Sequence, residues 1–156
     1  MPQTLTEIRE ELAARGIRPK HKFGQNFLHD HNQLRKLLAA AAPAPGELVL
    51  EVGPGTGNLT RHLVGAGAKV TAVEKDDALA ERLPQAVPGL GALVHGDVLR
   101  VGLRPVVRRM IEEAAEVDKA PSPPTVKIVA NLPYNITKEF LLAALPLGGE
   151  IGRAHV

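Results

Sequence analysis

The residues best suited to chemistry form two motifs, each placed where an apolar, strand-like run ends. The first, Glu51-Val-Gly-Pro-Gly-Thr-Gly-Asn-Leu-Thr60, sets three glycines between such a run and a helical pattern. The second, Asn131-Leu-Pro-Tyr134, directly follows the run Val126–Ala130. A glycine-rich turn lets the backbone approach a nucleoside closely, and an amide beside an aromatic ring suits a planar amine. The pair predicts transfer of a methyl group to the exocyclic nitrogen of a base.

The glycine spacing bears on which nucleoside ligand is bound. Gly53, Gly55 and Gly57 are the candidate cofactor-binding glycines. A dinucleotide-binding loop would have its third glycine one position later, where Asn58 stands. A plain strand-to-helix turn is the alternative interpretation of this segment.

Two acidic residues at later strand ends narrow the choice of cofactor. Glu74 ends the second predicted strand, where a carboxylate can accept hydrogen bonds from both ribose hydroxyls, and Asp97 follows the third, within reach of an adenine amine. Either acid taken singly could be a helix N-cap or a surface charge. Because three successive strand ends carry suitable residues, we expect an adenosine without phosphate, and S-adenosyl-L-methionine fits.

The second motif supplies the groups that a weakly nucleophilic exocyclic amine needs. Asn131 offers a side-chain oxygen, the Leu132-Pro133 backbone offers a carbonyl, and Tyr134 offers a stacking face. These four are the candidate catalytic residues, and Asn131 is also a candidate cofactor contact. No strong base is required, since orientation alone can contribute about 7–11 kcal/mol. An asparagine-initiated turn that closes a strand is the alternative.

The elements that position these motifs alternate between strand and helix. Continuous apolar runs predict buried parallel strands with helices on both faces, an α/β architecture. We expect four strands, Leu48–Val52, Ala68–Val73, Ala92–His95 and Val126–Ala130, with helices over 59–64, 76–83, 106–114 and from 140 onward, preceded by helices near 5–12 and 30–38.

Composition sets the broad class. The 156 residues are 44% hydrophobic and 23% charged, include no cysteine and carry a net charge of +2, which predicts one globular domain without disulfides or thiolate metal sites. No apolar run approaches the roughly 20 residues needed to span a bilayer, so we expect a soluble, cytoplasmic protein. His29 and His31 lack a carboxylate cluster, and no metal site is expected.

A basic arm, residues 15–29, precedes the first strand. From Arg15 to Lys36 the chain has six lysines or arginines against one acid, Asp30. Such a cluster attracts phosphates and makes binding sensitive to salt. Arg18, Lys20 and Lys22 are therefore candidate contacts to phosphates, the alternative being a solvated face.

At this point the motifs resemble a known family. Phe23-Gly-Gln-Asn-Phe-Leu28, the segment 51–60, Val73-Glu74, Gly96-Asp97 and Asn131-Leu-Pro-Tyr-Asn135 are similar, in order and spacing, to the ribosomal RNA adenine N6,N6-dimethyltransferases. The resemblance covers about residues 15 to 147. It implies a Rossmann-like S-adenosylmethionine-dependent methyltransferase fold. It also implies dimethylation of two adjacent adenosines near the 3′ end of small-subunit rRNA, during ribosome biogenesis.

The resemblance assigns roles residue by residue. Asn26 and Leu28 of the arm, Gly53, Glu74, Asp97 and Asn131 would contact the cofactor, and Asn131 and Tyr134 would hold the target base. The substrate partner would be rRNA in a small-subunit precursor, and Arg18, Lys20 and Lys22 would face its phosphates. A sister enzyme acting on large-subunit rRNA, a non-catalytic nucleic-acid-binding relative and a nicotinamide dehydrogenase are the alternatives.

The sequence departs from the family in length. Members continue with three more strands, a further aromatic that sandwiches the base and a small helical RNA-binding domain, so residues 1–149 are expected to be the N-terminal part of a catalytic domain. Residues 150–156 match one reading frame of a common sequencing adapter and are expected to be a non-native tail. The fourth strand would then lie at an open sheet edge and favour self-association, and the chain could be inactive.

Overall fold

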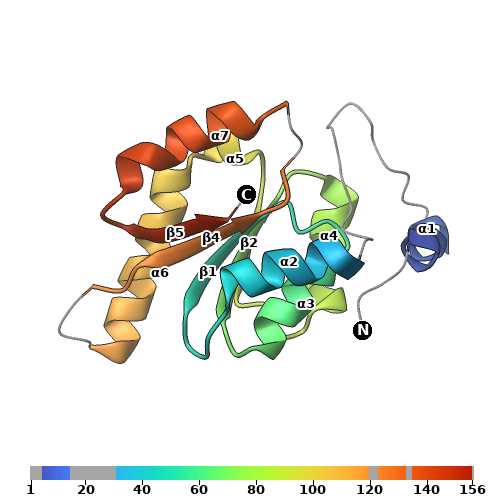
Figure 1. Cartoon of the computed structure of the whole chain (residues 1–156), viewed down its shortest axis with the longest axis horizontal. Helices are drawn as coiled ribbons and strands as arrows, with labels where there is room; N and C mark the ends of the chain where they lie inside the picture. The colour runs from blue at the N-terminus through green and yellow to red at the C-terminus, as the bar shows by residue number, and fades with distance from the viewer. Residues whose placement is uncertain (1–4, 15–30, 120–122, 133–134, 156) are drawn as a thin grey trace.

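The computed structural model describes residues 5–14, 31–119, 123–132 and 135–155. Its centre is a five-stranded parallel sheet with the order β3-β2-β1-β4-β5, drawn in Figure 1. The strands are β1 (Leu48–Val52), β2 (Lys69–Glu74), β3 (Ala92–His95), β4 (Val126–Ala130) and β5 (Ile151–His155).

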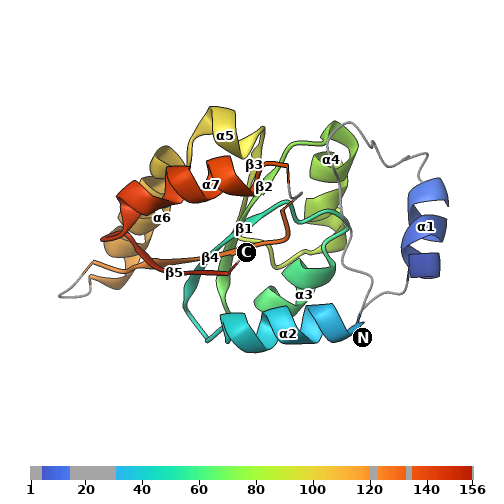
Figure 2. The ribbon, with the colours of Figure 1, turned by 45° about the horizontal axis from the view of Figure 1, so that its top comes forward.

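Helices cover both faces of this sheet (Figures 1 and 2). One layer consists of α2 (His31–Ala41), α3 (Asn58–Gly65) and α4 (Asp77–Ala86), and the other of α5 (Val98–Val101), α6 (Leu103–Asp118) and α7 (Thr137–Ala144). A further helix, α1 (Leu5–Ala14), precedes them, and a 3₁₀ turn, η2 (Leu145–Leu147), follows α7.

The central strands are buried along their whole length, which explains their unbroken apolar runs. All five residues of β1 and all five of β4 are buried. Alternate side chains of β1 serve the two cores: Leu48, Leu50 and Val52 pack with α6 and α7, while Val49 packs with α2 and α3. Apolar layers on both faces thus stabilise the sheet, and polar residues lie at the carboxyl ends of its strands.

Strand register brings the two sequence motifs to one place. Val52, the last residue of β1, pairs with Val73 of β2 on one side and with Ala130 of β4 on the other. The chain runs from β1 outward through β2 and β3 before it crosses back to β4, so the order reverses beside β1. Ligands of open α/β sheets bind at such a reversal, outside the carboxyl ends of the strands.

The predicted α/β architecture with a parallel sheet is confirmed, and three of the four predicted strands have the expected bounds. The expectation of four strands was wrong, because β5 pairs with β4. Only the ends of β5, Ile151 and His155, are partly buried, and Gly152, Arg153 and Ala154 are exposed. An edge strand with so little burial has no apolar periodicity, so only backbone pairing with β4 reveals it.

The presence of β5 also corrects the expected sheet edge. β4 was expected at the open edge, but it lies inside the sheet, and β3 and β5 are the outer strands. Val126 donates its backbone N–H to the Glu150 carbonyl at 3.0 Å, which starts the pairing. Within the described part of the chain, no helix is both long and apolar enough to cross a membrane.

Candidate functional site

The glycine-rich loop between β1 and α3 has a left-handed backbone at all three candidate glycines. Gly57 has a φ of 86° and precedes the first turn of α3. A Cβ placed there would lie 2.9 Å from both Leu83 Cδ1 and Val87 Cγ2 of the α4 segment. Glycine therefore allows this loop to pack against α4 without backbone strain or a steric clash. The geometry gives Gly57 a packing role, and its contact with a cofactor stays a prediction.

Gly53 connects the loop to the second motif. Its φ is 74°, and a Cβ there would lie 3.7 Å from the backbone oxygen of Asn131. The two candidate motifs, far apart in the sequence, are thus neighbours at the carboxyl ends of β1 and β4. Asn131 and Leu132 are both half-buried, and Leu132 packs against the core beneath α6 and α7.

Glu74 holds the loop to the end of β2. One carboxylate oxygen accepts the Gly55 N–H at 3.1 Å, and the other accepts the Asp76 N–H at 2.9 Å. The side chain is buried. Burial raises the pKa of the Glu74 carboxyl, and the nearby Asp76 charge adds to this, while the backbone N–H groups of Asp76, Gly55 and Lys75 act in the opposite direction. Glu74, the predicted acceptor for the ribose hydroxyls, is therefore already hydrogen-bonded to the glycine-rich loop.

A second buried acid, Glu51, lies beneath the same loop. Its carboxyl accepts the Thr60 hydroxyl at 2.6 Å, and it is only 2% exposed. Burial raises the pKa of Glu51 to about 8, with the Glu74 charge adding to the effect and the Thr60 hydrogen bond opposing it. Near neutral pH this group is mostly protonated.

Asp97 lies one strand further along the edge, after β3. One of its oxygens caps α5 by accepting the Leu99 N–H at 3.0 Å, and the other lies 3.1 Å from Lys75 Nζ. Partial burial acts to raise the pKa of Asp97, but the Leu99 N–H and the Lys75 and Arg100 charges outweigh it and lower the pKa. Asp97 is thus an ionised acceptor whose bonds go to Lys75 and Leu99 rather than to the glycine-rich loop.

Other predicted site residues lie outside the described residues. These are Pro133 and Tyr134 of the second motif, and Arg18, Lys20, Lys22, Asn26 and Leu28 of the basic arm. Their predicted roles stay predictions. Among the residues that the structure describes, no group of three or more histidines and acids could hold a metal ion.

Sequence reasoning missed several polar residues that support this edge. Arg82 of α4 is buried and donates from Nη1 to the Thr56 carbonyl inside the glycine-rich loop at 3.0 Å. Asp76 caps α4 by accepting the N–H groups of Ala78 and Leu79. An aspartate before a helical pattern is a readable cap signal, whereas nothing in the sequence connects Arg82 to Thr56.

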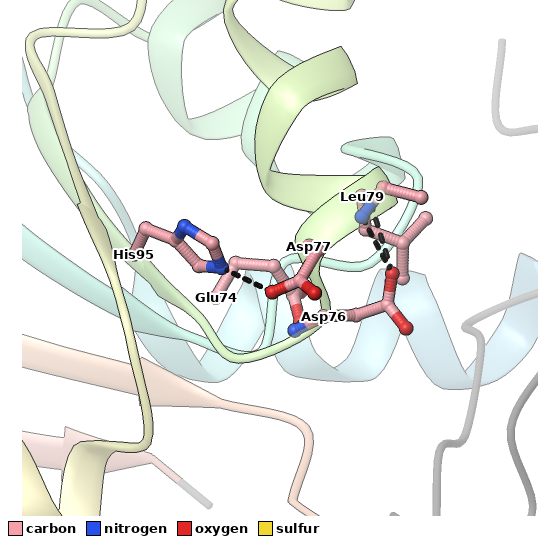
Figure 3. Close-up of polar contacts among 6 residues, drawn as sticks. Glu74, Asp76, Asp77, Leu79 and His95 are labelled. Atoms are coloured by element: carbon pink, nitrogen blue, oxygen red, sulfur yellow. Dashed lines mark hydrogen bonds and ion pairs between the residues drawn. The ribbon is translucent and has the colours of Figure 1, made fainter.

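Figure 3 shows the acids that gather at the end of β2, beside His95 of β3. Glu74, Asp76 and Asp77 follow one another around the turn into α4, and His95 of β3 points toward Asp77, with 2.9 Å between His95 Nε2 and Asp77 Oδ1. A ligand with a phosphate would meet repulsion here, and one that carries positive charge would be favoured.

The comparisons with known proteins agree with this geometry. A family model described as ribosomal RNA adenine dimethylase matches residues 16–152. This chain belongs to that family. Its curated relatives include Ribosomal RNA small subunit methyltransferase A from Deinococcus radiodurans, 42% identical over 131 residues that make up 83% of this chain and 39% of the relative.

Two further relatives with the same description extend the agreement. The protein from Mycobacterium tuberculosis is 44% identical over 140 residues, covering 90% of this chain and 42% of its own. The protein from Streptomyces avermitilis is 39% identical over 157 residues, covering 96% of this chain and 48% of its own. The chain therefore spans less than half the length of the curated relatives that it matches.

Solved structures show the same fold. The crystal structure of the 23S rRNA methyltransferase ErmE is 29% identical with a TM-score of 0.58, and the match covers 81% of this chain and 45% of that one. A dimethyladenosine transferase from Plasmodium falciparum is 22% identical with a TM-score of 0.57, covering 81% and 40%. The expected Rossmann-like methyltransferase fold is confirmed.

Proposed function

We propose that this chain carries the cofactor-binding and base-positioning part of an S-adenosylmethionine-dependent rRNA adenine N6-dimethyltransferase. The observation that carries this proposal is the loop geometry at Gly55, whose N–H donates to the Glu74 carboxylate at 3.1 Å. In a dinucleotide-binding fold the glycine-rich turn receives a pyrophosphate. Here the Gly55 N–H donates to a buried acid, and Asn58 stands where a dinucleotide-binding loop has its third glycine, which favours a nucleoside without phosphate over a nicotinamide cofactor.

The donor set of the site fits S-adenosylmethionine. Glu74 would hold the ribose, since each of its oxygens has a lone pair beyond the one used by the backbone. Asp97 would accept the adenine amine, and the Gly53 backbone, which has no side chain, would lie against the methionine part. When bound, the sulfonium supplies an activated methyl group. Asn26 and Leu28 of the basic arm would also contact the cofactor and cover it.

The chain's own residues would orient the acceptor. The exocyclic amine of a target adenine has two N–H bonds, for which Asn131 would offer its side-chain oxygen and the Leu132-Pro133 segment a backbone carbonyl. Accepting both bonds favours a pyramidal nitrogen with its lone pair directed at the methyl carbon. Tyr134 would hold the ring by stacking. The closeness of Gly53 to the Asn131 backbone supports this role, because a Cβ at position 53 would lie 3.7 Å from the Asn131 oxygen and Asn131 is therefore beside the glycine-rich loop.

No protein base is needed in this scheme. The amine nitrogen would take the methyl carbon as that carbon's bond to the sulfonium sulfur breaks, leaving a neutral thioether on the cofactor and an acidic ammonium on the base that would lose its proton to water. Catalysis would come from proximity and orientation, a contribution of about 7–11 kcal/mol in favourable cases. Glu51, a buried acid beneath the glycine-rich loop, already holds its proton near neutral pH and would not serve as such a base.

For the substrate, we propose two adjacent adenosines near the 3′ end of small-subunit rRNA in a cytoplasmic precursor particle. The names of the curated relatives support the small subunit. Arg18, Lys20 and Lys22 of the basic arm would contact RNA phosphates. The likeness to the 23S rRNA methyltransferase ErmE supports large-subunit rRNA as a second candidate.

Cofactor binding is tested by titrating the chain with S-adenosylmethionine and, separately, with NAD in a calorimeter. We expect binding of the first only, and Glu74→Ala should abolish it. Glu113→Ala, an exposed acid on α6, is the control and should bind normally. Binding of NAD alone would support a dehydrogenase, and binding of neither would support a non-catalytic relative.

Methyl transfer is tested with a chain extended to the length of the relatives. Labelled S-adenosylmethionine and immature small or large subunits would be the substrates, and modified adenosines would be mapped by mass spectrometry. We expect dimethyladenosine in the small subunit, and none with Asn131→Ala. Product confined to the large subunit would favour the second candidate, and full activity of Asn131→Ala would contradict the acceptor role.

A further inference from the structure

Lys75 lies beside Asp97, the residue proposed to recognise the adenine of the cofactor. It directly follows Glu74 at the end of β2, while Asp97 follows β3, the neighbouring strand. The Gly96 N–H donates to the Glu74 carbonyl at 2.8 Å, which continues the pairing of these strand ends. The Lys75 side chain then crosses between the strands, and its Nζ lies 3.1 Å from Asp97 Oδ2.

The Asp97 carboxylate is fixed from two sides. The Leu99 N–H holds Oδ1 at 3.0 Å, and the Lys75 ammonium holds Oδ2. A carboxylate with a different donor on each oxygen cannot rotate about its Cβ–Cγ bond without losing a charge-assisted hydrogen bond. The Asp97 side chain is 21% exposed, so it remains open to a ligand while its orientation is set.

We propose that Lys75 is a positioning residue that sets adenine selectivity by holding the Asp97 carboxylate in one orientation as a pure acceptor. This rests on the proposed function, in which Asp97 accepts the amine of the cofactor's adenine. An ionised carboxylate has no proton to donate. It therefore favours the amino group of adenine and rejects the carbonyl oxygen of hypoxanthine at the same position.

The pair contributes little to stability by itself, which makes the selectivity role testable. Lys75 is 49% exposed, and ion pairs this open to solvent contribute little to stability. Lys69 offers a matched control at the other end of β2: it is 48% exposed, and its Nζ lies 3.3 Å from Asp118 Oδ2. Both lysines can be changed to methionine without disturbing the apolar core.

The experiment measures the affinity of the 156-residue chain for S-adenosylhomocysteine and for S-inosylhomocysteine by calorimetry. Wild type should prefer the adenine compound about tenfold or more, because a site built around an amine leaves its acceptor opposed by an oxygen in the analogue. Lys75→Met should reduce this preference about threefold to fivefold. Lys75→Arg should restore it, and Lys69→Met should leave it unchanged.

A double-mutant cycle separates an effect through Asp97 from a direct one. Asp97→Asn should weaken or reverse the preference, since an amide can donate to the hypoxanthine oxygen. In that background Lys75→Met should have no further effect. The proposal would be overturned if Lys75→Met left the preference unchanged or weakened the binding of both compounds equally. It would also be overturned if Lys75→Met had its full effect on the preference in the Asp97→Asn background.

The outcomes also separate this proposal from the proposed function. A wild-type chain that prefers the adenine compound while Lys75→Met retains the full preference supports the cofactor assignment and overturns the role of Lys75 alone. A wild-type chain that binds neither compound overturns the cofactor assignment, and the role of Lys75 with it.

Discussion

The Thr60 hydroxyl donates a 2.6 Å hydrogen bond to the Glu51 carboxyl in a fully buried position under the glycine-rich loop. Burial and the neighbouring Glu74 charge raise the pKa of Glu51 to about 8 despite this bond. In the unfolded chain the same group would titrate near 4.5. Between these values the folded state keeps a proton that the unfolded state has released.

Stability should therefore fall as the pH rises from about 4.5 to about 8, by up to about 1.4 kcal/mol per pH unit from this group. Glu51→Gln keeps the shape and the acceptor but cannot ionise. Its free energy of unfolding, measured by urea denaturation from pH 5 to 9, should decline less steeply than that of wild type and exceed it at pH 9. Parallel pH profiles for the two proteins would contradict a protonated Glu51.

Gly57→Ala should destabilise the chain by about 2–4 kcal/mol. The substitution places a Cβ at a φ of 86° and 2.9 Å from two α4-segment side chains, so left-handed strain adds to overpacking. Gly65→Ala is the matched control, because Gly65 lies in α3 with nothing within 4 Å of its Cβ. That change should stabilise by about 0.5–1 kcal/mol. Equal effects in thermal unfolding would contradict the packing role of Gly57.

The strands were predictable because burial on both faces leaves an unbroken apolar run. Leu48–Val52 and Val126–Ala130 have the predicted bounds for this reason. The location of the strand ends could then be inferred, because parallel strands place their carboxyl ends at the same edge of a sheet. Thus the placement of the glycine-rich loop and Asn131 at the ends of two neighbouring strands could be inferred from the pattern alone.

The side-chain hydrogen bonds that support the site could not be inferred from the sequence pattern in the same way. Arg82 reaches Thr56 across 26 positions of sequence, and Lys75 reaches Asp97 across 22. Charged side chains have no periodic signature, so such bonds depend on how helices and strands pack. The short helix α5 was missed because its four residues are too few for a helical period.

Lys127→Met should loosen α2 and destabilise the chain by about 2–3 kcal/mol. The ammonium of this buried lysine donates to the carbonyls of Ala41 and Ala42 at the end of α2, and lies 2.7 Å from Glu47 Oε1. Methionine keeps the apolar stem but leaves those acceptors without their donor. Hydrogen exchange of α2 amides should rise selectively.

Lys69→Met serves as the control for Lys127, since the pair of Lys69 with Asp118 is half-exposed. We expect it to change stability by less than about 0.5 kcal/mol. If Lys127→Met were equally mild, the buried bonds to α2 would not contribute as proposed.

Ending the chain at Gly149 should lower stability and promote self-association. We propose that residues 150–156 are a non-native tail, and in the structure residues 151–155 form β5 and pair with β4. Without them the apolar strand β4 would become an edge with unpaired N–H and C=O groups, which templates pairing with a second copy. The shortened chain should therefore show a concentration-dependent mass in analytical ultracentrifugation and a lower midpoint in urea.

A side-chain change in β5 distinguishes backbone pairing from side-chain contacts. Arg153 is exposed, and Arg153→Ala keeps the strand while removing the side chain, so this variant should behave as wild type. Because β4 pairs through its backbone, only loss of the whole strand should expose it. A shortened chain that stays monomeric with unchanged stability would show that β5 does not protect this edge.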